Sequence, residues 1–476
     1  MFTKEKLVLW GPWVLIASYA FLVFSQLTTF PGLWLDEGFK MQLARNFADT
    51  GIMGMQFEPG EVVYNIHSAS TGWPIAAILG GFFKIFGTSL VTARIYSSLF
   101  LIGTVILLYY LSKKLWGSKV GVFVLLLLVT FAPLYSIGKM VLSEVPSIFW
   151  LVAGLALSFS RLRPLNKALL MGIFFGLFAA GKLQFAGLLF PSLFLAHVYA
   201  LKSKTMTWGE VLITWFISAS LVLPTLWMSL QKIPGSGGGV GLTNIYASAC
   251  RLCDVGSNLV LFTRHTTLMY LAILFLLAIV ASVIYVRKRE TVSWQTVFLV
   301  LFALGDLAYF LLSPQVFRYL LPLQIILLVF APWALGKILA AYRGSKYIWA
   351  GQFLLLALVL VQAVHFVYFA DIARSDDVVR FEQFAKTNLN EDESIGAVNS
   401  SFTSVLVPLS HFRQFVHFPG REEGHNFLRD APELWPDVII YEPYNYRTDV
   451  EPYLPQLKKL YSSVATFGGI YIWKKI

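Results

Sequence analysis

Two adjacent carboxylates, Asp36 and Glu37, follow directly on the first long apolar stretch of the sequence. A third acid, Glu144, stands in a very short polar segment between two further apolar stretches, in IGKMVLSEVPSIFW. A carboxylate beside a hydroxyl group can accept its proton in the transition state, which accelerates a reaction by about 10²–10⁴-fold. These acids could therefore perform acid–base chemistry at the boundary between an apolar layer and water.

Several cations stand at similar boundaries. Lys182 interrupts the apolar run FAAGKLQFAGLLFP, and Arg318 with Tyr319 opens another run in SPQVFRYLLPLQ. Arg45 and Lys139 each follow or precede one of the acids by a few residues. Lysine and arginine form charge-assisted hydrogen bonds with phosphate oxygens, so cations near carboxylates suit group transfer from a lipid phosphate. Each cation could instead simply extend from the end of an apolar helix into water.

The residues after the acidic pair predict an amphipathic helix. Apolar side chains recur at helical spacing through FKMQLARNFADTG, and the pattern places Lys40 and Arg45 on the polar side. We expect this helix to lie flat on the outer leaflet with Asp36 and Glu37 at its start, where the helix dipole favours anions. Capping the helix is the alternative role of the pair, although a cap needs no second acid. A similar capping role is open for Glu144, which precedes a first-turn proline.

The composition places these residues in a membrane protein. Hydrophobic residues make up 57% of the 476 residues, charged residues make up 13%, and the mean hydropathy is +0.68. A soluble domain usually contains about 25% charged residues. Apolar runs near the ~20 residues needed to cross a bilayer recur along the chain. They predict a polytopic α-helical membrane protein with eleven spans, at 7–28, 90–111, 119–138, 146–160, 167–181, 183–201, 211–230, 266–286, 293–313, 318–340 and 347–370.

Basic clusters between the spans set the orientation, because such clusters stay in the cytoplasm. With eleven spans all of them can be cytoplasmic; they fall at 4–6, 113–119, 161–167, 202–204, 287–289 and 342–346. The N-terminus is then inside, and Asp36, Glu37 and Glu144 face outward. The segment 72–87 is apolar but short and carries Lys84. We expect it to be a juxtamembrane or re-entrant helix on the outer face, with a short true span as the alternative.

A different kind of sequence begins near residue 371. Residues 371–476 contain 15 acids and 11 bases, which leaves 11 of the 26 acids and 26 of the 37 bases in residues 1–370. The basic excess thus belongs to the membrane part, where it indicates orientation and anionic lipid rather than nucleic acid. Strand-like and helix-like segments alternate after 371 and predict a small extracytoplasmic α/β domain. The predicted strands are SIGAVNS, RQFVHF, PDVIIYE and IYIWKK, and the predicted helices are 375–388, 423–431 and 449–460.

We therefore divide the chain into a transmembrane domain, 1–370, and an extracytoplasmic domain, 371–476. The first extracytoplasmic loop, 29–89, would carry the acidic pair. The N-terminus resembles a signal peptide but lacks a small-x-small cleavage site, so we expect an uncleaved first span. Cys250 and Cys253 form one CRLC, for which a local disulfide or two free thiols is favoured over half of a zinc site. A divalent metal at the acidic pair stays open.

Five segments carry the most specific information, and together they span roughly residues 7–340. They are LWLDEGFKMQLARN, STGWPIAAILGGFFKIFGTSLVTARIYSS, VLSEVPSIFWLVAGLAL, AAGKLQFAGLLFP and FRYLLPL. Their order resembles that of the GT-C glycosyltransferases, in particular the bacterial relatives of protein O-mannosyltransferases and the lipid A aminoarabinose transferases. The acidic pair followed by an Ala-Arg-Asn helix is the most specific element of the resemblance, and FRYLLP is the next.

The resemblance implies an integral-membrane glycosyltransferase of the cytoplasmic membrane. Its donor would be a polyprenyl-phosphate sugar, and its acceptor a glycan, lipid or protein on the outer face, with inversion of the anomeric carbon. Asp36 would be the base, with Glu37 as its neighbour and Glu144 as a second acid. Lys182 and Arg318 would lie at the lipid phosphate.

One departure from the family pattern affects the substrate contacts. Relatives commonly carry Lys-Pro-Pro where this chain has STGWP at 70–74, which removes an expected cation; His67 is an alternative source of that charge. Two other functions stay open, a lipid or oligosaccharide transporter and a scaffold whose C-terminal part binds a partner. A transporter is expected to show internal repeats and paired broken helices, yet the sequence has no clear repeat and only Asp306 lies deep in a span.

Overall fold

The computed structural model describes most of the chain. The described ranges are 4–32, 34–58, 61–63, 71–230, 254–264, 266–287, 291–312, 317–341, 345–372, 374–390, 392–398, 414–418, 427–442 and 451–476. Cys250, Cys253 and His67 lie outside the described residues, so what the sequence predicts for them stays a prediction.

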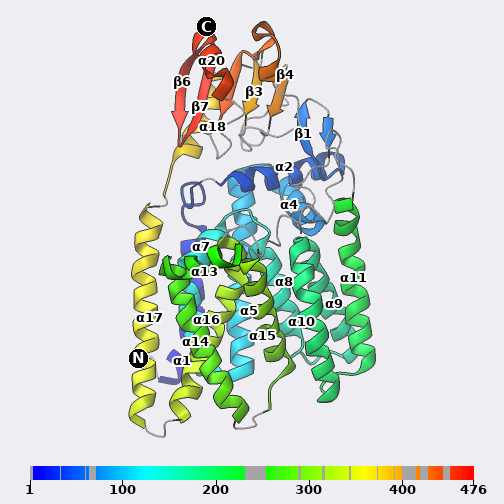
Figure 1. The fold of residues 1–476 in the computed structure, drawn as a ribbon, viewed down its shortest axis with the longest axis vertical. Coiled ribbons are helices and arrows are strands. Elements are labelled where there is room, and N and C mark those ends of the chain that lie inside the picture. The colour runs from blue at the N-terminus through cyan, green and yellow to red at the C-terminus, as the bar shows by residue number, and fades with distance from the viewer. Residues whose placement is uncertain are drawn as a thin grey trace.

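All eleven predicted spans fall on helices (Figure 1). Seven described helices are long and apolar enough to cross a membrane alone, and α6 with α7 makes an eighth if this pair, bent by 63°, is one span. The helices at the other three predicted spans, α1, α8 and α14, are apolar over shorter stretches. Helices dominate because in lipid each backbone polar group must be satisfied within its own segment. The helices are α1 (Lys4–Phe24), α5 (Leu90–Trp116), α6 (Ser118–Val129), α7 (Ala132–Lys139), α8 (Glu144–Leu157), α9 (Pro164–Gly181), α10 (Leu183–Lys202), α11 (Trp208–Leu230), α13 (Asp254–Arg264), α14 (Thr266–Arg287), α15 (Trp294–Leu311), α16 (Leu321–Ala341) and α17 (Ser345–Ile372).

Two further helices, α2 (Leu35–Thr50) and α4 (Trp73–Phe86), pack against each other at one end of the bundle, below the C-terminal sheet (Figure 1). α4 also contacts α5 and α9. The expectation that α2 exposes a polar side is wrong for Lys40, which is only 9% exposed. Met41 and Phe39 are buried as well, in two different apolar clusters. α2 is enclosed on both sides because α4 covers one face and the C-terminal sheet covers another.

A short hairpin follows α2 in the chain. Its strands, β1 (Met55–Glu58) and β2 (Glu61–Val63), are antiparallel, and β1 contacts β4 of the C-terminal sheet. This hairpin was not predicted from the sequence. The hairpin links the segment after α2 to the edge of the C-terminal sheet.

The C-terminal part is an α/β unit, as predicted, built on a five-stranded sheet of order β4-β3-β5-β7-β6. β3 pairs in parallel with β4 and β5, while β7 runs antiparallel to both β5 and β6. All four predicted strands are confirmed, but β6 was missed, and the predicted helix 423–431 shows only a 3-10 turn in its described part. The elements are α18 (Asp377–Asn388), β3 (Ser394–Val398), β4 (Gln414–Phe418), η3 (Phe427–Arg429), η4 (Pro432–Leu434), β5 (Val438–Tyr441), η6 (Glu451–Tyr453), α20 (Leu454–Leu460), β6 (Tyr461–Phe467) and β7 (Ile470–Lys475).

One apolar cluster joins the C-terminal sheet to the helices beneath it. Ile395 and Ile472 from the sheet belong to the same buried cluster as Met41 of α2, Leu79 of α4 and Tyr96 of α5. All five side chains are fully buried. The sheet and the helices α2, α4 and α5 therefore share a hydrophobic core, which fixes α2 in place beneath the sheet.

Candidate active site

Glu37 is held in a fully buried ion pair with Arg94 of α5. Arg94 donates from Nε to Oε1 of Glu37 over 3.1 Å and from Nη2 to Oε2 over 2.9 Å. Glu37 also accepts hydrogen bonds from the backbone N–H groups of Val141 and Trp34. The bond from Trp34 caps the start of α2. With both oxygens engaged, Glu37 fixes the first turn of α2 and is a positioning residue rather than an acid free to move a proton.

Arg94 carries only a weak signal in the sequence and was not predicted as a site residue. It lies in VTARIYSS, near the start of a predicted span, where an arginine is rare without a partner. Besides Glu37, its Nη1 donates to the carbonyl groups of Leu27 and Pro31, over 2.8 and 2.9 Å. Arg94 thus ties α5 to both α2 and the segment that precedes it.

Asp36 points in a different direction from Glu37 and forms an ion pair with Arg318. Arg318 belongs to η1 (Phe317–Leu320), a 3-10 turn that leads into α16. The two side chains are about one-fifth exposed, at 22% for Asp36 and 20% for Arg318. Asp36 does not occupy the cap position of α2, which is Trp34. The capping role considered for the acidic pair therefore falls to Glu37, and Asp36 stays accessible.

Glu144, at the start of α8, joins the same group of charges. Its Oε1 lies 2.6 Å from Nζ of Lys182 and 3.6 Å from Nε of Arg318. Lys182 is in extended backbone between the end of α9 and the start of α10, as the interruption of the apolar run predicted. Ser143, the cap residue of α8, makes no capping hydrogen bond with its side chain. Glu144 is thus tied to cations from two other helices.

Tyr319 forms part of the wall around these cations. The ammonium group of Lys182 lies over its ring, 4.1 Å from the centroid, and the guanidinium carbon of Arg318 lies 5.5 Å from it. An aromatic face attracts a cation, and more strongly when water is excluded. Tyr319 therefore helps to hold both cations in place.

Lys40 completes the group, one helical turn after Asp36 on α2. It interacts electrostatically with Asp36 and Glu144, which favour its charge, and with Arg318 and Lys182, which oppose it. Burial is the largest effect, and it lowers the pKa of the Lys40 ammonium below the usual value. Among the residues that the structure describes, Lys40 has no hydrogen-bond or ion-pair partner of its own. The spacing from Asp36, i to i+4, was the sequence signal for this proximity.

These residues form what we call the charge cluster: Asp36, Lys40, Glu144, Lys182 and Arg318. It contains two acids and three cations. Asp36 forms an ion pair with Arg318, and Glu144 forms one with Lys182, whereas Lys40 takes part in neither ion pair. The cluster can bind an anion, because a phosphate oxygen can replace a carboxylate oxygen on Arg318 or Lys182.

The structure does not bring Arg45 and Lys139 into the charge cluster. Arg45 contacts its neighbour Asn46, and burial lowers the pKa of its guanidinium against the attraction of Asp49. Lys139 is fully buried and donates to the carbonyl of Ser25 over 2.8 Å. Its ammonium also lies over two aromatic rings. Lys139 is thus held by contacts within the protein, and a role of Arg45 or Lys139 in substrate binding stays a prediction.

The chain's departure from the family pattern at 70–74 has a packing consequence. Gly72 has a φ of +73°, and a Cβ there would lie 2.0 Å from the carbonyl oxygen of Ala180. Ala180 stands two residues before Lys182, at the turn between α9 and α10. Only glycine fits this approach, so the segment that leads into α4 rests directly on the turn that presents Lys182.

The described residues include no group of three or more His, Cys, Asp or Glu side chains that could hold a metal ion. The acids of the charge cluster face cations instead.

No family model matches the chain, and no curated protein sequence matches it. The structure, however, is similar to that of ArnT from Cupriavidus metallidurans bound to undecaprenyl phosphate, with a TM-score of 0.65, 13% identity and 98% of both chains covered. The chain has the GT-C glycosyltransferase fold. The apo state of the same ArnT gives a TM-score of 0.61 at 14% identity, again over 98% of both chains.

A second GT-C enzyme gives the same result at lower similarity. The Archaeoglobus fulgidus oligosaccharyltransferase in its apo form has a TM-score of 0.54 and 11% identity, over 97% of this chain and 74% of its own. The resemblance seen in the sequence is thereby confirmed for the fold. The helical bundle and the C-terminal sheet both take part in the match, since nearly the whole chain is covered.

Proposed function

We propose that this GT-C protein is a glycosyltransferase that moves a sugar from a polyprenyl-phosphate donor to an acceptor, with inversion. The observation that carries the proposal is the convergence of two acids and three cations, the charge cluster, at one end of the helical bundle. Its members come from elements far apart in sequence, and each lies at or near the end of a helix. The phosphate of a membrane-anchored lipid would lie at the depth where these helices end, so the three cations could contact it.

In the proposed reaction the bond between the anomeric carbon and the phosphate oxygen breaks, and the acceptor oxygen bonds to that carbon. The phosphate leaves with the electron pair of the broken bond, and Arg318 and Lys182 bind its oxygens. Binding the phosphate draws Arg318 away from Asp36, which frees this carboxylate to accept the proton of the acceptor hydroxyl. Glu144 keeps Lys182 in place, and Glu37 keeps the first turn of α2 in place.

The orientation is part of the proposal. We infer that the N-terminus lies in the cytoplasm, that the charge cluster and residues 371–476 lie outside, and that the membrane is the cytoplasmic membrane. The clustering of basic residues at the opposite helix ends supports this orientation. A reporter that is active only outside the cytoplasm, fused after Ile476, should be active; the same reporter fused within 113–119 should be inactive.

The reaction can be tested in liposomes that contain the full-length protein and a polyprenyl-phosphate sugar. With a membrane extract as the source of acceptor, we expect release of free polyprenyl phosphate. Asp36→Asn should lower the rate by about 10²-fold or more, because it removes the base while keeping the size of the side chain. Intact donor that only moves between the leaflets would instead indicate a transporter and would overturn the proposal.

The donor can be identified separately. A strain that lacks the protein should accumulate the polyprenyl-phosphate sugar that the enzyme consumes, and mass spectrometry of its lipids would give the mass of the sugar. A deletion strain with an unchanged lipid profile would count against a lipid-linked donor.

A further inference from the structure

One buried acid takes no part in the ion pairs of the charge cluster. Asp306 lies in the second half of α15 and is 1% exposed, within a helix long and apolar enough to cross a membrane. An ionisable side chain at such a place is costly, and its role is found from the group that it holds. Oδ2 of Asp306 accepts a hydrogen bond from the backbone N–H of Leu323 over 2.9 Å, whereas Oδ1 has no hydrogen-bond partner among the described residues. The hydrogen bond of Asp306 is thus directed at the backbone of α16.

This hydrogen bond lies in the first turn of α16. Leu323 is the third residue of the helix, and the first four N–H groups of an α-helix need acceptors from outside it. Pro322, beside it, has no N–H group to donate. The 3-10 turn η1 runs directly into α16 without an intervening residue. The acceptor that α15 provides therefore fixes both the start of α16 and the end of η1.

Two aromatic contacts from the same part of α15 continue this attachment. The ring centroid of Phe310 lies 6.4 Å from that of Phe317, and the ring centroid of Tyr309 lies 6.2 Å from that of Tyr319. Residues three and four positions after Asp306 lie on the same face of the helix as Asp306. One face of α15 therefore holds η1 and the first turn of α16 at three points.

The turn that is held in this way carries two residues of the candidate active site. Nε of Arg318 lies 3.6 Å from Oε1 of Glu144, and the ring of Tyr319 lies under the ammonium group of Lys182. Lys182 is also close enough to Asp306 to attract its carboxylate. A binding group must be held within about 0.5 Å of its productive position. The position of η1 therefore determines whether Arg318 and Lys182 can act on the same ligand.

We propose that Asp306 is a positioning residue for Arg318. By holding the first turn of α16, it fixes η1 so that the guanidinium group of Arg318 reaches the charge cluster and meets the phosphate of the donor. The attachment of η1 does not depend on any reaction, whereas its effect on the donor rests on the proposed function. Asparagine would offer an oxygen at the same place, so the role requires the acceptor atom rather than the negative charge.

The first measurement is hydrogen–deuterium exchange of the purified full-length protein, read in peptides that cover residues 317–324. Asp306→Leu removes the acceptor oxygen, so we expect exchange about tenfold faster over these residues. Asp306→Ala removes the same oxygen with a smaller side chain and is the second variant, in case Asp306→Leu does not fold. Asp306→Asn should exchange like the wild type. Unchanged exchange in Asp306→Leu or Asp306→Ala would overturn the proposal.

The second measurement is titration of each variant with a polyprenyl-phosphate sugar. Asp306→Leu should raise the apparent Kd about tenfold, because Arg318 is no longer held at the phosphate. The same substitution in an Arg318→Ala background should have no further effect, since Asp306 acts through the side chain that is already absent. Equal losses in the two backgrounds would show a general weakening of the protein and overturn the proposal. A wild-type protein that binds no donor would overturn the proposed function instead, and the exchange rates would still decide whether Asp306 holds η1.

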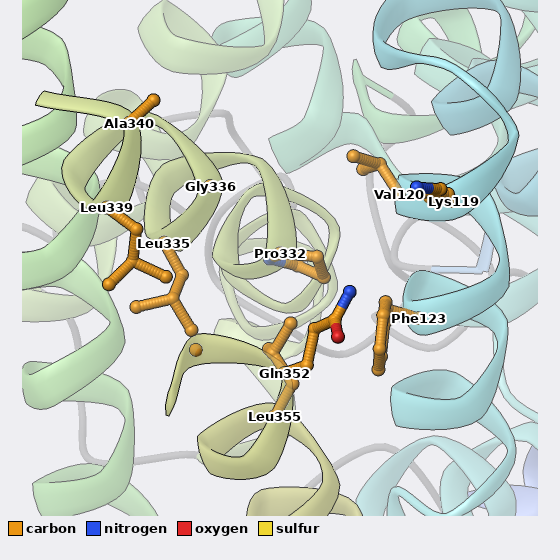
Figure 2. A pocket seen from close by; sticks show the side chains of 11 residues that line it. Lys119, Val120, Phe123, Pro332, Leu335, Gly336, Leu339, Ala340, Gln352 and Leu355 are labelled. Carbon is orange, nitrogen blue, oxygen red and sulfur yellow. The ribbon is translucent and has the colours of Figure 1, made fainter. Parts of the chain in front are cut away.

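Leu335→Ala is the matched control for a general loss of stability. Leu335 also belongs to α16, but it lines a cavity of about 240 Å³ between α6, α16 and α17 (Figure 2). Fourteen residues separate it from Leu321, which is roughly 21 Å of helix. Enlarging this cavity destabilises the bundle without touching the first turn of α16. Exchange over 317–324 and donor binding should therefore stay at the wild-type level; a loss equal to that of Asp306→Leu would refute the proposed role of Asp306.

Discussion

Replacing Glu37 by glutamine tests whether the buried ion pair, rather than chemistry, explains this acid. The substitution keeps the shape of the side chain and removes its charge, so the Arg94 guanidinium stays buried without a counter-charge. Breaking a buried pair by removing one partner destabilises a protein by about 3–5 kcal/mol. Arg94 keeps the carbonyl groups of Leu27 and Pro31 as acceptors, and glutamine still offers one oxygen. We therefore expect the lower end of that range, about 3 kcal/mol.

The assay is thermal unfolding of the purified protein in detergent, followed by tryptophan fluorescence. The entropy of unfolding is roughly 2.1 cal/mol/K per residue, so in a chain of 476 residues a change of 1 kcal/mol shifts Tm by about 1 °C. We therefore expect Glu37→Gln to lower Tm by about 3 °C. Asp36→Asn is the neighbouring control and should unfold close to the wild-type temperature, because its ion pair with Arg318 is partly exposed.

A double substitution separates the interaction energy of the Glu37–Arg94 ion pair from the effect of changing each residue alone. Glu37→Met combined with Arg94→Met removes both charges, so it should destabilise less than the sum of the single changes. Wild-type Tm in Glu37→Gln, or strict additivity in the double variant, would refute the conclusion that this pair holds α2 in place.

Three further predictions concern the charge cluster and its supporting loop. Lys182→Ala and Arg318→Ala should each raise the apparent Kd for the polyprenyl-phosphate donor, because each removes a charge-assisted contact of about 1.5–3 kcal/mol; unchanged titrations would leave both residues without a role in binding. Lys40→Met should leave Tm unchanged or higher, since it removes a buried cation without a partner, and should weaken donor binding at least about tenfold. Donor binding should also weaken as pH rises through the lowered pKa of Lys40, and Lys40→Arg should remove that dependence. Gly72→Ala should sharply reduce the yield of folded protein, because the new methyl group would collide with the carbonyl of Ala180. Gly87→Ala is the control: its φ is similar, at +82°, but no atom lies within 4 Å of the added Cβ, so it should cost only backbone strain. Equal yields of the two variants would contradict the close contact with Ala180.

The helical bundle could be predicted because the bilayer imposes the same requirement on every span. Apolar length alone located a helix at each predicted span, and seven of the described helices, or eight with α6 and α7 as one span, are long enough to cross a membrane. The distribution of basic residues placed the acids and the cations at the same end. That reasoning brought Asp36, Glu144, Lys182 and Arg318 together correctly, although more than a hundred residues separate some of them. The apolar length and the flanking basic residues of each helix, taken one helix at a time, were therefore sufficient to predict which end of the bundle these four residues share.

The sequence did not distinguish the two adjacent acids, because their roles depend on what packs against each. Glu37 meets Arg94, a residue inside an apolar run whose partner no local pattern indicates. Lys40 was placed on a water-facing side because the helical period cannot show that α4 and the C-terminal sheet cover both faces of α2. β6 was missed for a similar reason: five of its seven residues are half-buried or exposed within YSSVATF, and pairing with β7 rather than its own pattern makes it a strand.

The apolar cluster shared by the sheet and α2 determines where this chain can be cut or exchanged. A truncation after α17 would remove the sheet and expose the apolar side chains of Met41, Leu79 and Tyr96 to water. The remaining helical fragment should therefore aggregate in detergent solution. A chimera that carries the sheet of another protein faces the same constraint, because the transplanted sheet must bring a complementary α2 with it. Since α2 also carries Asp36, exchanging the sheet would exchange the proposed base as well. The C-terminal sheet and the proposed base therefore belong to one structural unit, even though about 340 residues of chain separate Asp36 from the start of α18.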